Sequence, residues 1–171
     1  MKYHCFGIPK SHKLLTESAG YKELLAPFYK TKHTKNDEWM HEDYEKNTAF
    51  PEFLIHKTSS GHLVRSKSEA IIDMALTNNN IPFRYECALY IGSKVIYPDF
   101  TIKHPATGEI ILWEHHGKMD DPEYCQKTFS KLEVYASAGY IPGINLITTY
   151  ETLQSPLNSE DVKKTIDYYF S

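Results

Sequence analysis

Residues 94–116 read KVIYPDFTIKHPATGEIILWEHH, and this stretch decides the fold. It contains two apolar runs separated by the turn-forming residues 105–108 (PATG). Proline and glycine at those places favour a tight reversal, so we expect two neighbouring antiparallel strands. If the turn is centred between residues 106 and 107, Asp99 of the first strand lies opposite Glu114 of the second.

Asp99 and Glu114 are carboxylates set among apolar residues. An unpaired carboxylate in such surroundings is costly to desolvate, so something cationic should lie near Asp99. Two facing carboxylates also repel each other, which favours a divalent cation held between them. The alternative is that Asp99 caps a turn and Glu114 faces solvent.

The alternation of side chains along a strand divides residues 113–116 between two faces. Glu114 and His116 point to one face, whereas Trp113 and His115 point to the other. Glu114 and His116 are therefore natural partners or co-ligands.

Helices and strands are expected on both sides of this stretch. Residues 66–69 (SKSE) resemble a capping box, and the helix that they begin ends at the Asn78–Asn80 run. The other expected elements are a hairpin over residues 83–102 that turns at residues 92–93, a helix over 121–139, a strand over 141–149 and a helix over 159–169. The order from residue 66 is α-β-β-β-α-β followed by a terminal helix, which predicts an α/β fold.

Composition limits the class of protein. The chain has 171 residues, 41% hydrophobic and 24% charged, as in one ordinary globular domain. It contains no apolar run long enough to span a membrane and begins with no apolar leader, so we expect a cytoplasmic protein without a membrane partner. Residues 1–68 carry a net charge of +3 and residues 69–171 of −6, which suits an enzyme that gathers carboxylates around a cation. We predict an N-terminal extension (1–64) packed on a core (65–171).

These residues resemble the PD-(D/E)XK nucleases. The resemblance rests on Pro98-Asp99 on one strand, Glu114-x-His116 on the next, Glu69 on the preceding helix and the order of elements over about half the chain. It implies a restriction-endonuclease-like core, a mixed central sheet flanked by helices, and Mg²⁺- or Mn²⁺-dependent hydrolysis of DNA. Asp99, Glu114 and the backbone carbonyl of His115 would hold the metal, and Glu69 would bind a second ion or its water.

One departure concerns the final lysine of the family motif, which is His116 here. Three residues could replace it: His116 itself, Lys118, or Lys131 on the following helix. Tyr124, Lys127, Lys131 and Tyr135 recur at offsets of three or four and line one helix face. We favour Lys131, because Lys131 to Tyr135 (KLEVY) also resembles the helical Gln-x-x-x-Tyr of the RecB-type branch.

The predicted site therefore has two sets of residues. The catalytic set is Glu69, Asp99, Glu114, His116 and Lys131. The substrate-binding set is Arg65, Lys67, Lys118 and Tyr135. Arg65 and Lys67 precede the Glu69 helix and would meet phosphates at its N-terminus, although plain surface charges are the alternative.

Two other functions compete with a nuclease. The missing lysine also suits a nucleic-acid-binding or assembly module that kept the fold and lost the chemistry. A zinc hydrolase using His115, His116 and Cys125 ranks last, because adjacent histidines point to opposite faces of a strand. Double-strand cutters of the resembled fold often dimerise, so DNA, a second copy of the chain and other nucleic-acid-processing proteins are the expected partners.

Overall fold

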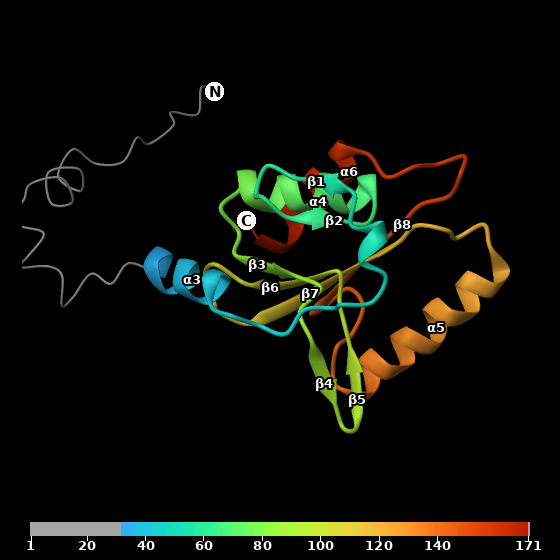
Figure 1. The fold of residues 1–171 in the computed structure, drawn as a ribbon, viewed down its shortest axis with the longest axis horizontal. Coiled ribbons are helices and arrows are strands. Elements are labelled where there is room, and N and C mark those ends of the chain that lie inside the picture. The colour runs from blue at the N-terminus through green and yellow to red at the C-terminus, as the bar shows by residue number, and fades with distance from the viewer. Residues whose placement is uncertain (1–31, 171) are drawn as a thin grey trace, which may run out of the picture.

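The computed structural model describes residues 32–170 (Figure 1). Residues 1–31 of the predicted N-terminal extension lie outside the described residues. In chain order, the elements are α3 (Lys32–His41), η1 (Pro51–Phe53), β1 (His56–Lys57), β2 (Leu63–Val64), α4 (Lys67–Asn78), β3 (Phe83–Tyr85), β4 (Leu89–Ile91), β5 (Lys94–Ile96), β6 (Phe100–Lys103), β7 (Ile110–His116), α5 (Pro122–Ser137), β8 (Leu146–Tyr150) and α6 (Ser159–Phe170).

The central sheet has the strand order β3-β6-β7-β8. β3 and β6 are antiparallel because the chain reverses in the β4–β5 hairpin, and β6 and β7 are antiparallel because a short turn joins them. β7 and β8 are parallel because α5 crosses between them. The sheet is therefore mixed, and the predicted α/β class is confirmed. Among the described helices, none is both long enough and apolar enough to cross a membrane.

The predicted register between β6 and β7 is also confirmed. Phe100 pairs with Trp113 and Lys103 with Ile110, as a turn centred between residues 106 and 107 requires. Asp99 directly precedes β6 and so falls at the level of Glu114.

The hairpin predicted over residues 83–102 is present but is interrupted in the middle. β3 pairs with β6 and β4 with β5, both in the register that the Gly92 turn sets. Between these pairs, Glu86 has a positive φ of 45° and Lys46 bridges Cys87. The prediction of two unbroken strands is wrong here, because a segment far upstream takes over this part of the ladder. Residues 97 and 98 are thereby left out of strand pairing, whereas the Asp99 carbonyl still accepts the Glu86 N–H at 3.0 Å.

Helices cover both faces of the sheet (Figure 1). α4 and α6 pack together on one face, and α5 lies on the other. The larger core cluster, under α4 and α6, includes Ile72, Leu76, Phe83, Phe100, Ile102, Trp113, Ile147, Val162 and Ile166. Burial of each such side chain contributes about 1.5–3 kcal/mol. The smaller cluster consists of Leu112, Tyr135 and Leu146.

Local sequence signals place the two helices that flank the site. Ser66 caps α4 by accepting the N–H of Glu69, and Asp121 caps α5 ahead of Pro122, as predicted. The strand predicted over 141–149 is shorter, because residues 141–145 form a turn in which Gly143 has a φ of 84°.

Candidate active site

Asp99 directly precedes β6, where the chain enters the central sheet. The backbone N–H of His115 donates to Asp99 Oδ2 at 2.7 Å. Continuation of the ladder would bring Pro98 opposite His115, but proline has no N–H to donate. The His115 carbonyl, on the side of β7 where Asp99 lies, therefore receives no ladder hydrogen bond from Pro98.

Glu114 is almost fully buried under α5, with 3% of its surface exposed. Lys131 Nζ lies 2.8 Å from Glu114 Oε1 and 2.9 Å from Oε2, and it also donates to the Tyr97 carbonyl at 3.4 Å. The hydroxyl of Tyr135 donates to Glu114 Oε1. The face of α5 that carries Lys131 and Tyr135 is thus turned toward β7.

The charges of this cluster depend on one another. Burial and the nearby charge of Glu114 raise the pKa of Asp99 well above its usual value, although the Lys131 ammonium opposes the rise. Burial alone would lower the pKa of Lys131, but the carboxylates of Glu114 and Asp99 outweigh it and raise that pKa. Lys131 is therefore a cation held between two acids.

Glu69 stands in the first turn of α4 with its carboxylate fixed by three donors. These are the Tyr85 hydroxyl at 2.6 Å, the Arg65 N–H at 2.9 Å and the Ser66 hydroxyl at 2.9 Å. The charge of Glu69 contributes to the raised pKa of Asp99, so Glu69 belongs electrostatically to the same cluster. No sequence signal had marked Tyr85 as its partner.

His116 lies on the Glu114 face of β7, as predicted, and is 3% exposed. Its ring stacks on Tyr150 with centroids 5.2 Å apart. The Nε2 atom is buried and has no hydrogen-bond partner within the described part of the chain. Burial, together with the charges of Lys131 and His115, lowers the pKa of His116 to about 4, so its imidazole is neutral near pH 7.

This lowered pKa predicts a loss of stability in acid. A histidine of the unfolded chain has a pKa of 6.5, so between pH 6.5 and 4 the unfolded state binds more protons than the folded state. The His116 contribution to the free energy of unfolding should therefore fall by about 2–3 kcal/mol as the pH drops through this window, whereas Asp99, with its raised pKa, acts in the opposite direction. Urea unfolding at pH 7 and pH 4.5 in metal-free buffer should show a greater loss of stability in the parent than in His116→Phe, and the difference measures the His116 contribution. The exposed-site control His41→Gln should behave as the parent; equal slopes in all three proteins would refute the assignment.

The His115 side chain points to the opposite face, where it joins a second polar network. Thr149 Oγ1 lies 3.0 Å from His115 Nδ1 and accepts the Trp113 indole N–H at 3.0 Å. Glu151 Oε1 lies 3.3 Å from His115 Nε2, and the other Glu151 oxygen accepts the hydroxyl of Ser68 at 2.7 Å. This network joins the N-terminal turn of α4, next to Glu69, to the β7 residue that follows Glu114.

Glu151 is the residue of this network that sequence reasoning missed. Burial acts to raise its pKa, but hydrogen bonds from Leu157 N–H, Ser68 and His115 outweigh it and lower the pKa. The sequence signal that could have indicated Glu151 is its place directly after the apolar strand β8. Because β8 runs parallel to β7, Glu151 lies at the same end of the sheet as His116. Glu151 connects Ser68 of α4 to His115 of β7, on the face of β7 opposite to Glu114.

The four predicted substrate-binding residues differ in accessibility. Lys67 and Lys118 are exposed. Tyr135 is fully buried and offers no surface to a substrate as placed, so its role here is to position Glu114. The Arg65 guanidinium is held by both oxygens of Glu86 and by the carbonyls of Ala49 and Phe50.

The residues at the predicted metal site offer oxygen donors, but they do not form a complete set of ligands. Within residues 32–170, no group of three or more His, Cys, Asp or Glu side chains is placed to hold a metal ion. Magnesium, however, is often held by only one or two carboxylates and water. Asp99, Glu114 and the His115 carbonyl offer such oxygens, and a cation bound there would offset the raised pKa of Asp99. Magnesium or manganese stays a prediction.

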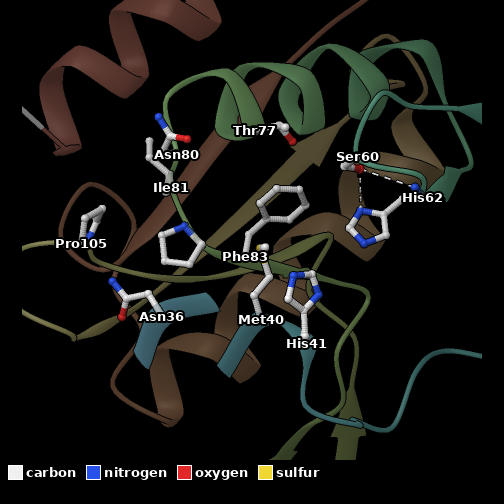
Figure 2. A pocket seen from close by; sticks show the side chains of 11 residues that line it. Asn36, Met40, His41, Ser60, His62, Thr77, Asn80, Ile81, Phe83 and Pro105 are labelled. Atoms are coloured by element: carbon white, nitrogen blue, oxygen red, sulfur yellow. Dashed lines mark hydrogen bonds between the residues drawn. The ribbon is translucent and has the colours of Figure 1, made fainter. Parts of the chain in front are cut away.

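A cavity of about 510 Å³ lies apart from this cluster, between α3, the C-terminal end of α4 and β3 (Figure 2). In its wall, Ser60 and His62 both hydrogen-bond the buried carboxylate of Asp73, at 2.9 and 2.8 Å. Asp99, Glu114 and Lys131 do not line it. The cavity therefore has no part in the carboxylate site.

Comparisons with known proteins give no match. No protein-family model matches the sequence, and neither does any curated protein or solved structure. The function is therefore argued from the site itself.

Proposed function

We propose that the protein is a metal-dependent nuclease that hydrolyses DNA phosphodiester bonds, built on a restriction-endonuclease-like core. The observation that carries the proposal is the cluster of Asp99, Glu114 and Lys131. Two carboxylates, one directly before β6 and one within β7, face each other in the strand register, and a lysine contacts one of them at 2.8 Å. Lys131 thus supplies, from α5, the cation that the Glu114-x-His116 sequence lacks.

The order of helices and strands is compatible with the proposed nuclease but is not evidence enough for it, because one fold can host many activities. α4, the hairpin strands β3 and β6, β7, α5 and β8 follow in the proposed α-β-β-β-α-β order. The acids come from α4, the start of β6 and the middle of β7, which meet at one region of the sheet. Asp99 and Glu114 face each other in the β6–β7 register, and Glu69 acts on Asp99 through its charge.

In this proposal Asp99, Glu114 and the His115 carbonyl hold the metal, with Glu69 nearby. When bound, Mg²⁺ or Mn²⁺ lowers the pKa of water and stabilises charge on the phosphate. Lys131 stabilises the same negative charge as it grows in the transition state. Neutral His116 lies beside the site, but its buried Nε2 and a pKa lowered to about 4 make it a weak base. The proton released as the water oxygen bonds to phosphorus would therefore pass to solvent, and a water molecule would protonate the leaving oxygen as its bond to phosphorus breaks.

The proposal is tested by incubating the full chain with supercoiled plasmid, linear duplex and single strands, in Mg²⁺ and separately in Mn²⁺. We expect cleavage of at least one substrate that stops with EDTA and is lost in Asp99→Ala. Cleavage that survives Asp99→Ala would come from a contaminant or another site, and so would contradict the proposal. Lys127→Met, an exposed change on the same helix, should cleave as the parent does.

A binding module without chemistry is the second candidate. It is favoured by one observation: Lys131 contacts both oxygens of Glu114, so the carboxylate already has a protein cation. The two functions differ in their response to metal. A nuclease should gain thermal stability in Mn²⁺ through Asp99 and Glu114, whereas a module should bind DNA with no metal-induced shift and no cleavage.

A further inference from the structure

Two phenylalanines stand exposed in the segment that precedes β1. Phe50 and Phe53 are 65% and 56% exposed, and their rings contact each other with centroids 6.1 Å apart and planes tilted by 43°. Large aromatic side chains normally bury most of their surface, so an exposed pair in contact is informative. We call Phe50 and Phe53 the aromatic platform.

The backbone of the platform is held in an unusual conformation. Phe50 has φ 52° and ψ 56°, the left-handed region that bulky side chains rarely adopt. The guanidinium of Arg65 donates to the carbonyls of Phe50 and Ala49, both at 2.7 Å, and is itself held by Glu86. Such a conformation persists only where its surroundings enforce it, and it is frequent at functional sites.

The same arginine connects the platform to the proposed site. The backbone N–H of Arg65 donates to Glu69 Oε2 at 2.9 Å, while its side chain holds Phe50. One residue therefore contacts both the backbone of the platform and Glu69, an acid of the proposed site.

The charge around the platform suits a polyanion. Residues 46–67 contain three lysines and one acid, Glu52, besides Arg65, which is already paired with Glu86, in a chain whose net charge is −3. Lys57 of β1 and Lys67 of α4 are both exposed. Aromatic rings flanked by cations are what single-stranded nucleic acids bind, because bases stack on the rings and phosphates meet the cations.

We propose that the aromatic platform stacks unpaired bases of a single-stranded stretch of substrate next to the cleavage site. The inference rests on the proposed function and adds a substrate class to it: nucleic acid with unpaired bases, such as a single strand, a flap or a frayed end. A continuous duplex, with its bases already stacked, gains nothing from the platform.

The test measures binding without cleavage, in the full chain carrying Asp99→Asn. Fluorescence anisotropy is recorded with a labelled single strand of about 12 deoxythymidines and with a blunt duplex of the same length. The double substitution Phe50→Ala/Phe53→Ala should weaken single-strand binding about 10-fold and change duplex binding less than 2-fold. Phe129→Ala, an equally exposed aromatic change on α5, should leave both unchanged.

Two further measurements keep the test decisive if the double variant folds poorly. In Phe53→Trp, the added indole fluorescence should be quenched by the single strand and not by the duplex; absence of quenching would overturn the proposal. Light scattering tests the alternative that the platform is a contact between copies of this chain. A double variant with intact single-strand binding and a lower molecular mass than the parent would show that alternative to be right.

If the parent does not cleave DNA but the double substitution weakens single-strand binding, only the nuclease proposal is refuted. Cleavage with unchanged binding in the double variant refutes only the platform.

Discussion

Lys131→Met is expected to lower the rate of DNA cleavage by about 1,000-fold, the usual cost of removing one preorganised group that stabilises transition-state charge. The reason is that Lys131 Nζ lies 2.8 Å from Glu114 and interacts with the charge of Asp99, so it would lie close to a phosphate bound by a metal at these carboxylates. The rate should be measured at saturating Mg²⁺ and substrate, because the loss is expected in kcat rather than in KM.

Lys131→Met also removes the cation beside buried Glu114, so its stability must be followed. We expect a lower Tm without metal and a larger rise in Tm on adding Mg²⁺ than in the parent, because the ion replaces the lost charge. Lys127→Met is the matched control, one turn away on the same helix and exposed. A variant that is folded and keeps more than a tenth of the parental rate would show that Lys131 is not the activator, and would return the choice to His116 or Lys118.

Arg65→Met is expected to lower the free energy of unfolding by about 3–5 kcal/mol, as the loss of one partner of a buried ion pair does. Glu86, whose side chain is 10% exposed, would be left without its bidentate partner at 2.7 Å. The carbonyls of Ala49 and Phe50 would lose their donors in the same change. Urea unfolding monitored by tryptophan fluorescence gives the value directly.

The comparison for Arg65 is Lys67→Met, two residues along the chain and exposed, which should change the free energy of unfolding by less than about 0.5 kcal/mol. The sequence had predicted that both residues bind substrate. If Arg65→Met unfolds at the parental urea concentration and instead weakens DNA binding, Arg65 is a phosphate contact and the packing role inferred from the structure is wrong.

The parts of the fold that sequence could predict depend on short-range signals. The turn at residues 105–108 and the alternation of the two runs were enough to pair Phe100 with Trp113 and so to place Asp99 at the level of Glu114. Ser66 and Asp121 marked the starts of α4 and α5 because helix caps are local in sequence. The spacing of Lys131 and Tyr135 likewise predicted one helix face, and both residues contact Glu114.

What could not be predicted depends on contacts between distant segments. The strand break after Glu86 arises because residues 45–47 pair there in place of residues 97 and 98, and no local sequence pattern indicates a competing segment so far upstream. The same holds for Glu151, whose partners Ser68 and His115 come from α4 and β7. Tyr135 was expected on the substrate side, but its full burial became visible only once α5 was packed on the sheet.

The central claim is that Asp99 and Glu114 hold one metal ion beside Lys131. Its most direct test is the anomalous difference map of crystals soaked in Mn²⁺. We predict one strong peak about 2.1 Å from an oxygen of Asp99 and an oxygen of Glu114, which disappears in Asp99→Ala crystals. A map without a peak there at saturating Mn²⁺, with Glu114 still held by Lys131 and Tyr135, would contradict the account.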